Sequence, residues 1–544
     1  MLAPIADAAE TGNLVKNPGF EAASGQEIFP EVLDGRAAAR RYERLRDLVT
    51  RAKRFGIDVY LYYATNYHHR VPKWFYQEHP DCQGYSWGNS MCTSSPKVLR
   101  YLDETTRHIF RGVPGLKGLV IIFDSEGCFS DAVGNRDRCP RCRNRKPEDI
   151  VSEYLTVIDK AMKQSSPDSE LIAWSYFTGH PQWVIRAIPK LPKDITLQAE
   201  FSKEAIIQRE GVRHIAGDYQ ITEIGPAPHF LVQAEAATAA GLKLSTKTEH
   251  SYSNEFVSVP YIPATLQYHK RVAAFRQYPI RAVFANWTHH GYSPNPNAEI
   301  LKWYSWDHEP KIDDLLADMA RSRFGAKAAP LFIEAWGHFS KGITYYPYSD
   351  AVARNPGPIQ VGPGLPLYLD ATQRLPSTWR SPVNDLSGTV PWGPDVVLKS
   401  FGRLEAEWQQ GVDRMSRALA DVPVGQRREA ERELGIAEAI LCCTRSYMNL
   451  TRFLVARERL DAETEPSLRQ TILDQMRTIA RAELENARKA LVVCAADSRV
   501  GYASGGSHVG GLYTPALIRW KIAQVESMLR DEMPKVLDIE GVPR

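Results

Sequence analysis

Between residues 41 and 288, stretches with helical apolar spacing alternate with short, strongly apolar runs. In residues 41–55, apolar side chains recur on one side of a helix until Gly56 interrupts the pattern. The other predicted helices are residues 97–111 and 148–164. The predicted strands are residues 59–63, 119–126, 171–177, 196–202, 243–249 and 281–288. This alternation predicts an α/β fold in which helices flank a parallel sheet.

Repeated strand and helix units of this size favour a (β/α)8 barrel of the TIM type over a doubly wound sheet. No Gly-x-Gly-x-x-Gly follows the first strand, and the chain has no Walker-type loop. Because a closed barrel needs eight strands, two are missing from the pattern. Either residues 1–40 contain remnants of them, or residues 214–221 add a strand, or the barrel is incomplete at its N-terminus.

After residue 401 the apolar pattern is helical throughout. One predicted helical stripe consists of Leu404, Trp408, Val412, Met415 and Leu419. Residues 427–457 and 466–491 continue this pattern, and Thr514-Pro515 supplies the N-cap and first-turn proline of a last helix. We therefore expect an α-helical C-terminal domain, with Met415, Met448 and Met476 in its core.

Proline and glycine are concentrated between these two regions, in residues 341–400. Such a composition is typical of a linker, or of a long loop region over the barrel. The predicted organisation is therefore an N-terminal segment (1–40), a barrel (41–340), a linker or loop region (341–400) and a helical domain (401–544).

The composition excludes several classes of protein. Of the 544 residues, 67 are Lys or Arg and 64 are Asp or Glu, so the formal charge is only +3 and no basic run indicates a nucleic-acid partner. No apolar stretch reaches the roughly 18–20 residues of a membrane span, so we expect a soluble protein. Residues 1–12 show no signal peptide. The compartment stays open: cytoplasmic, or periplasmic or secreted if a signal was removed.

Two carboxylates follow the most apolar predicted strand. Asp124 and Glu126 end the segment that begins with Gly118-Leu119-Val120. Because side chains alternate across a strand, the two acids should share a face at the carboxyl end, where barrel enzymes react. An acidic pair after a strand can also be a helix N-cap, a loop salt bridge or a calcium site. The surrounding barrel pattern favours catalysis.

Glycoside hydrolysis usually needs a carboxylic acid that protonates the leaving oxygen and a second group that attacks or stabilises the anomeric carbon. Glu126 is the predicted general acid/base. Glu249 is the preferred second carboxylate, as the nucleophile of a retaining enzyme. In an alternative, Asp124 orients a substrate N-acetyl group that itself attacks. Glu255, just beyond the strand of residues 243–249, is a third candidate, or a ligand of a sugar hydroxyl. Spacing alone does not choose among them.

Other predicted strand ends carry groups of the kind that sugar sites use, because rings stack on pyranoses and polar tips bind hydroxyls. The predicted substrate-binding residues are Tyr67, His68, Trp174, Tyr176, Glu200, Lys247, Trp287, His289 and His290. Adjacent histidines on a strand face opposite ways, so the His-His pairs do not predict a catalytic metal. No Gly-x-Ser-x-Gly elbow predicts a serine nucleophile. We expect catalysis without a cofactor.

Five of the eight cysteines surround the predicted acid: Cys82, Cys92, Cys128, Cys139 and Cys142. Cys139 and Cys142 have the spacing of half a zinc site. Cys128, Cys92 or Cys82 are candidates for the remaining thiolates. The predicted set is Cys128, Cys139 and Cys142 on a structural zinc, with a disulfide or buried thiols as alternatives.

Several short motifs resemble bacterial glycoside hydrolases of the hexosaminidase-like and α-glucuronidase-like barrel superfamily. They are Phe123-Asp-Ser-Glu-Gly127, Cys139-Pro-Arg-Cys142, Ser258-Val-Pro-Tyr-Ile-Pro263, Trp306-Asp-His-Glu-Pro310, Arg323-Phe-Gly325, Ala335-Trp336 and Asp497-Ser-Arg-Val-Gly-Tyr502. The resemblance implies a barrel that hydrolyses O-glycosyl bonds. Hexosaminidases have an adjacent Asp-Glu pair on the fourth strand, whereas Ser125 separates the two acids here.

The sequence thus predicts an exo-acting glycoside hydrolase with an oligosaccharide or glycoconjugate substrate. A non-catalytic carbohydrate-binding barrel and a metal-dependent hydrolase are the alternative hypotheses. The sequence leaves the oligomeric state open, a homo-oligomer included.

Overall fold

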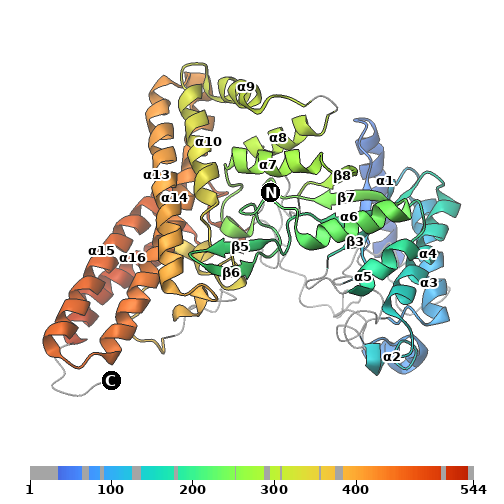
Figure 1. Ribbon diagram of the computed structural model, residues 1–544, viewed down its shortest axis with the longest axis horizontal. Helices are drawn as coiled ribbons and strands as arrows, with labels where there is room; N and C mark the ends of the chain where they lie inside the picture. Colours follow the sequence, from blue (N-terminus) through green and yellow to red (C-terminus); the bar gives the residue numbers. More distant parts are fainter. Residues whose placement is uncertain are drawn as a thin grey trace. The chain divides into compact units, whose positions relative to one another are not determined.

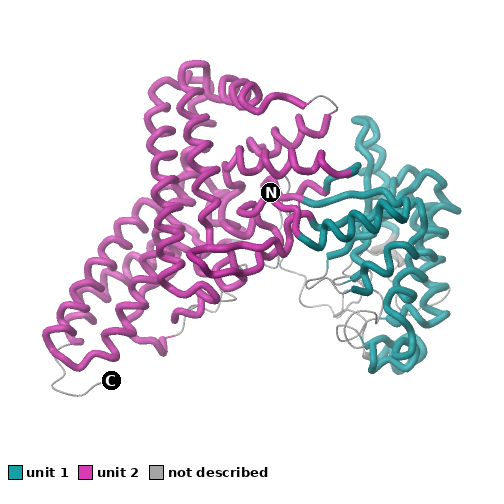
Figure 2. Tube along the Cα trace, viewed as in Figure 1, with its two compact units in different colours: residues 1–200, 228–247, 279–283 teal, residues 201–227, 248–278, 284–544 magenta. Residues whose placement is uncertain are grey.

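The computed structural model describes residues 35–63, 73–85, 91–124, 136–176, 182–251, 253–286, 294–306, 309–353, 357–373, 384–503 and 510–536. The chain forms two compact units (Figure 2). Unit 1 consists of Met1–Glu200, Pro228–Lys247 and Pro279–Val283, and unit 2 of Phe201–Ala227, Thr248–Tyr278 and Phe284–Arg544.

A six-stranded sheet forms the centre of unit 1 (Figure 1). Its strands, in spatial order, are β1 (Tyr60–Tyr62), β2 (Gly118–Ile122), β3 (Glu170–Ser175), β4 (Thr196–Glu200), β7 (Lys243–Lys247) and β8 (Ile280–Phe284). Neighbours from β1 to β7 pair in parallel. All six predicted strands are thus confirmed, and the sheet is the curled half of a barrel. Among the described residues, β1 and β8 are its two edges.

The strand register gives this sheet one polar face. Glu200 of β4 lies opposite Lys247 of β7, and Gln198 lies opposite Ser245. Trp174 of β3 pairs with Gln198 and therefore belongs to the same face. On the other face, α6 (Pro228–Ala240) packs against β4 and β7. Buried polar groups on one face and helices on the other are what a barrel wall requires.

Five further α-helices are described in unit 1, of which α1 precedes β1 and the others lie between successive strands. They are α1 (Gly35–Lys53), α2 (Lys73–Glu78), α3 (Pro96–Gly112), α4 (Pro147–Ser165) and α5 (Gln182–Ala187). Helices α3 and α4 begin with Pro96 and Pro147, whose fixed φ suits the first turn. Their apolar sides pack against each other, and α4 also packs against β3. The predicted helices at 41–55, 97–111 and 148–164 are confirmed.

Gly118, the first residue of β2, permits the close approach of β3. A Cβ added to it would lie 2.0 Å from the carbonyl oxygen of Glu170. We expect Gly118→Ala to lower the free energy of unfolding by about 1–3 kcal/mol, because one of the two strands must move. Chemical denaturation measures this loss.

Gly337→Ala is the matched control. Gly337 lies inside helix α10 (Ala329–Ile343) of unit 2, and a Cβ there meets no atom within 4 Å. The substitution should therefore stabilise the protein by roughly 0.5–1 kcal/mol, because alanine favours the helix. Equal effects of the two substitutions would contradict the register of β2 on β3.

Unit 2 is dominated by long helices. They are α7 (Thr265–Phe275), α8 (Pro296–Tyr304), α9 (Ile312–Phe324), α10 (Ala329–Ile343), α13 (Pro394–Ala418), α14 (Arg427–Ala462), α15 (Pro466–Ala496) and α16 (Pro515–Ser527). Helix α13 packs between α10 and α14, and α15 between α14 and α16 (Figure 1). Met415, Met448 and Met476 are buried, as the helical pattern predicts. Within the described residues, no helix combines the length and apolar character needed to cross a bilayer.

One expectation about the regions outside the main elements is revised. Residues 214–221 do not supply a barrel strand, because β6 (Val212–Ile215) pairs antiparallel with β5 (Ile206–Arg209) in a separate two-stranded sheet of unit 2. Residues 341–400 contain α11 (Asp350–Ala353) and α12 (Pro358–Val361). Many of their apolar side chains are buried in unit 2, including Tyr346, Tyr348, Ile359 and Leu367.

Candidate functional site

Five of the predicted site residues lie at the carboxyl ends of neighbouring strands in unit 1. We call them the strand-end cluster: Asp124, Trp174, Tyr176, Glu200 and Lys247. They follow or end β2, β3, β4 and β7, whose parallel pairing brings these ends to one edge of the sheet. The structure thus brings together residues that are 123 positions apart in the sequence, from Asp124 to Lys247.

Glu200 and Lys247 form a buried ion pair at the centre of this cluster. Lys247 Nζ lies 3.7 Å from Glu200 Oε2, and the two side chains are only 1% and 3% exposed. Trp174 Nε1 donates a hydrogen bond of 2.6 Å to Glu200 Oε1. Lys247 Nζ also lies 5.6 Å from the ring centroid of Trp174 and 5.4 Å from that of Tyr176. The two rings and the two charges therefore hold one another in fixed positions.

Asp124 holds the end of β3. Its Oδ2 accepts a hydrogen bond of 2.8 Å from Ser175 Oγ, and its Oδ1 accepts one of 2.7 Å from the amide of Tyr176. Gln233 of α6 donates in turn to Ser175 Oγ at 3.2 Å. Both oxygens of this fully buried carboxylate are thus engaged, and their two hydrogen bonds hold the aromatic end of β3 in place.

Several other predicted residues have no structural description. Glu126, Tyr67, His68, Trp287, His289, His290 and Cys128 lie outside the described residues. The roles predicted for them from the sequence therefore remain predictions.

Glu249 and His250 follow β7 and belong to unit 2. Both side chains are buried, at 2% and 5% exposure. His250 Nδ1 lies 2.7 Å from Ser251 Oγ and 3.4 Å from Asn295 Nδ2. Burial disfavours the charged imidazolium and lowers the pKa of His250 to about 4. His250 is therefore neutral in the folded protein at neutral pH.

This shift predicts a pH-dependent stability. Between pH 4 and about 6.5, His250 binds a proton in the unfolded state but not in the folded state. The free energy of unfolding therefore rises with pH across this window. The shift from 6.5 to about 4 corresponds to roughly 3 kcal/mol of stability gained across this window. Urea unfolding of the wild type and of His250→Gln at several pH values gives the slope of the unfolding free energy against pH for each protein. The difference between the two slopes measures the contribution of His250. Parallel slopes would contradict it.

Glu255 has the contacts of a structural residue. Its Oε1 accepts hydrogen bonds from the amides of Ile221 and Thr222, at 2.8 and 2.9 Å, and from Thr222 Oγ1 at 2.7 Å. Ser253 Oγ donates to its Oε2. The carboxylate is fully buried and fixes the loop at 221–222 against η7 (Asn254–Phe256). Both oxygens of Glu255 are thus committed to hydrogen bonds within the protein.

Gln198 and Ser245 belong to the same face as the strand-end cluster, although neither is among the site residues predicted from the sequence. Their positions could have been found from parity: Gln198 is two residues before Glu200, and Ser245 two before Lys247. Both are buried, and their side chains lie 3.5 Å apart. They continue the polar face of the sheet toward the amino ends of β4 and β7.

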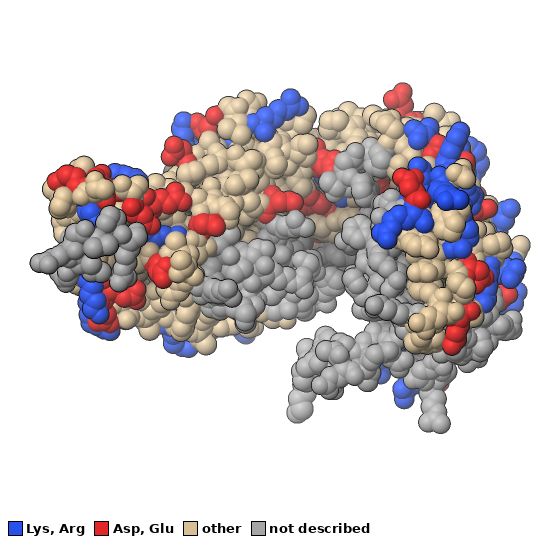
Figure 3. Space-filling view, turned by 90° about the horizontal axis from the view of Figure 1, so that it is seen from below, with Lys and Arg blue, Asp and Glu red and all other residues tan. Residues whose placement is uncertain are grey.

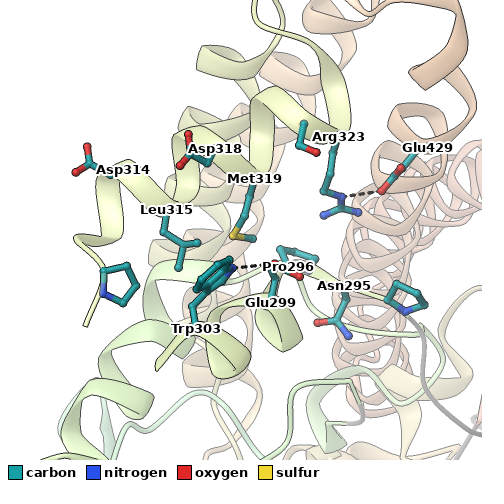
Figure 4. Close-up of a pocket in the computed structure, with 13 residues that line it drawn as sticks. Asn295, Pro296, Glu299, Trp303, Asp314, Leu315, Asp318, Met319, Arg323 and Glu429 are labelled. Carbon is teal, nitrogen blue, oxygen red and sulfur yellow. Dashed lines mark hydrogen bonds and ion pairs between the residues drawn. The ribbon is translucent and has the colours of Figure 1, made fainter. Parts of the chain in front are cut away.

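A pocket of about 520 Å³ lies in unit 2, between α8 and α9 (Figure 4). Trp303 forms one wall, and its Nε1 donates to Glu299 Oε1 at 2.9 Å. Arg323, bonded to Glu429 at 2.7 Å, borders the opposite side. The residues described around this pocket include none of the predicted site residues.

Three of the cysteines that the sequence analysis named as candidate thiolates also meet in unit 1. The sulfurs of Cys92, Cys139 and Cys142 lie within 4.8 Å of one another, and all three residues are buried. Cys92 thus joins the predicted C-x2-C pair, whereas Cys128 lies outside the described residues. The seven described cysteines carry thiols and form no disulfide with one another.

The surface charge agrees with the composition. On the face drawn in Figure 3, acidic and basic side chains both occur and are separated by uncharged surface. Such a mixed face is unlike the continuous basic stripe of nucleic-acid-binding proteins.

Solved glycosidase structures resemble this chain in fold. One is a GH138 enzyme targeting pectin rhamnogalacturonan II, with a TM-score of 0.56, 10% identity, and coverage of 94% of this chain and 75% of that one. Another is a family 89 glycoside hydrolase from Clostridium perfringens in complex with 2-acetamido-1,2-dideoxynojirmycin, with a TM-score of 0.53 and 12% identity. That match covers 93% of this chain but only 54% of the other protein. No family model and no curated protein matches the sequence. At these identities the similarity concerns the fold.

Proposed function

We propose that this protein is a glycoside hydrolase whose sugar site includes the strand-end cluster. The observation that carries this proposal is the convergence of Trp174, Tyr176, Glu200 and Lys247 at the carboxyl edge of a parallel sheet. In barrel enzymes that edge is where substrates react. The fold shared with two glycosidases supports the same class of activity.

The chemistry of the cluster suits a carbohydrate. Aromatic rings bind the apolar face of a pyranose, and charged groups at their margin bind its hydroxyls. Tyr176, which is half-buried, supplies the accessible ring, and the buried Trp174 and Lys247 hold it, at 5.3 Å between the two ring centroids and 5.4 Å from the Lys247 ammonium. Rings and charges that hold one another fixed lose little conformational entropy when a sugar binds.

For the reaction we assign Glu126 as general acid/base and Glu249 as the preferred second carboxylate, acting as nucleophile. The assignment rests on their sequence positions, two residues after Asp124 and two after Lys247. The bonds from Ser175 and Tyr176 to both oxygens of Asp124 disfavour the alternative in which this carboxylate orients an N-acetyl group. We also propose that the sheet belongs to a (β/α)8 barrel and that the enzyme acts at chain ends.

A panel of aryl glycosides, with product stereochemistry followed by NMR, tests this function. We expect hydrolysis of at least one α- or β-glycoside, with retention of configuration if Glu249 is the nucleophile. Net inversion would exclude Glu249 as the nucleophile but would still identify the protein as a glycoside hydrolase. Sugar binding in calorimetry without turnover on any member would favour the carbohydrate-binding alternative.

A further inference from the structure

Three cysteine sulfurs converge in unit 1 just before helices α3 and α4. Cys92 lies shortly before α3, whereas Cys139 and Cys142 lie between the short helix η5 (Arg136–Arg138) and α4. The Sγ atom of Cys92 lies 3.6 Å from that of Cys139 and 3.4 Å from that of Cys142. All three side chains are fully buried, at 0% exposure.

These distances suit three ligands of one metal ion. A disulfide would bring two sulfurs to about 2.05 Å. Tetrahedral zinc, with Zn–S bonds of about 2.3 Å, places its sulfurs roughly 3.7–3.8 Å apart. Two sulfurs can come this close through ordinary packing. Three sulfurs that lie this close to one another are typical of a metal site.

The backbone around the C-x2-C pair is already turned toward such a site. The amides of Cys142 and Arg143 donate to the carbonyl of Cys139 at 3.2 and 3.0 Å, and the turn brings both sulfurs to the same side. The amide of Cys92 donates to the carbonyl of Cys82 at 2.8 Å. This bond fixes the segment that carries the third sulfur. Loading of the site therefore requires little rearrangement.

Positive charge lies beside the sulfurs. The guanidinium of Arg141 interacts electrostatically with all three of them. Ser94 Oγ lies 3.2 Å from Cys142 Sγ and accepts a hydrogen bond of 2.8 Å from Arg145, which also pairs with Glu153. Three thiolates exceed the charge of a divalent ion by one, and the charge of Arg141 offsets this excess.

We propose that Cys92, Cys139 and Cys142 bind one structural Zn²⁺, which ties the start of α3 to the start of α4. Each thiol releases its proton to solvent as its Zn–S bond forms, and no oxidation is involved. Zinc takes four ligands, so one further ligand completes the coordination. The site stabilises unit 1 and is independent of the proposed glycosidase activity.

Metal analysis of the full-length protein tests the site. We expect about one equivalent of zinc after dialysis against metal-free buffer, and its loss in Cys139→Ser/Cys142→Ser. Cys494→Ser should keep it, because Cys494 is a buried thiol of unit 2 bonded only to backbone carbonyls of Val500 and Tyr513 among its described hydrogen bonds. Co²⁺ in place of zinc should give the absorption bands of tetrahedral thiolate coordination.

A second measurement needs no folded variant. Titration of the wild type with an organomercurial should release zinc to a chromogenic chelator in step with thiol modification. Chelation should also lower the midpoint of thermal unfolding. Protein without bound zinc and without Co²⁺ thiolate bands would overturn the proposal, and so would a mass deficit of two hydrogens that marks a disulfide. Zinc retained by the double variant would do the same.

Discussion

Glu126→Gln should lower the turnover of glycosides with poor leaving groups by about 10²- to 10⁴-fold, the usual contribution of a general acid. Glutamine keeps the shape of the side chain but cannot donate the proton that an alcohol leaving group needs. A dinitrophenolate leaves without protonation, so the loss on a dinitrophenyl glycoside should be much smaller for the bond-cleaving step. Steady-state kinetics on the two substrates measures this contrast.

Two controls sharpen this test. Glu485→Gln removes a carboxylate that is 73% exposed on helix α15 of unit 2, and it should leave both rates unchanged. In a retaining enzyme, azide should speed the slow second step of Glu126→Gln, because this anion attacks without a general base. A uniform loss on both substrates would point to a structural role, and undiminished turnover of the unactivated glycoside would remove Glu126 from catalysis.

The strand and helix pattern was enough to find the sheet of unit 1, for a physical reason. Strands such as β2 are buried on both faces, so they read as short apolar runs between amphipathic helices. The pattern of residues 214–221 misled, because this segment begins in β6, which forms a hairpin sheet with β5, and the residues of both strands alternate in burial. Local patterns give strands, but they do not say which sheet a strand joins.

The site was predictable where it depends on strand ends and less so where it depends on loops. Trp174, Glu200 and Lys247 meet because parallel register carries their positions to one edge. In the sequence, Asp124 and Glu255 are indistinguishable from catalytic acids, because the sequence does not show which groups donate hydrogen bonds to their oxygens. The partners of Glu255 lie more than 30 residues away, at Ile221 and Thr222. Only the folded backbone reveals that both carboxylates are engaged.

Lys247→Met should lower the free energy of unfolding by about 3–5 kcal/mol, the usual cost of breaking a buried ion pair from one side. The substitution keeps the volume of the side chain but leaves the carboxylate of Glu200, 3% exposed, without the cation 3.7 Å away. Chemical denaturation monitored by tryptophan fluorescence measures the loss, because Trp174 belongs to the same cluster.

Substitution of the other partner, Glu200, should lower the free energy of unfolding by less than Lys247→Met does. In Glu200→Gln, the amide keeps an oxygen for the indole of Trp174, and the cation of Lys247 still lies 5.6 Å and 5.4 Å from the centroids of two aromatic rings. Those rings stabilise a desolvated cation, by an estimated 2 kcal/mol or more. The double variant Lys247→Met/Glu200→Gln should recover much of the loss, since neither charge is then buried. Additive losses in this cycle would show that the two charges do not interact, and the strand-end cluster would then not be a preorganised site.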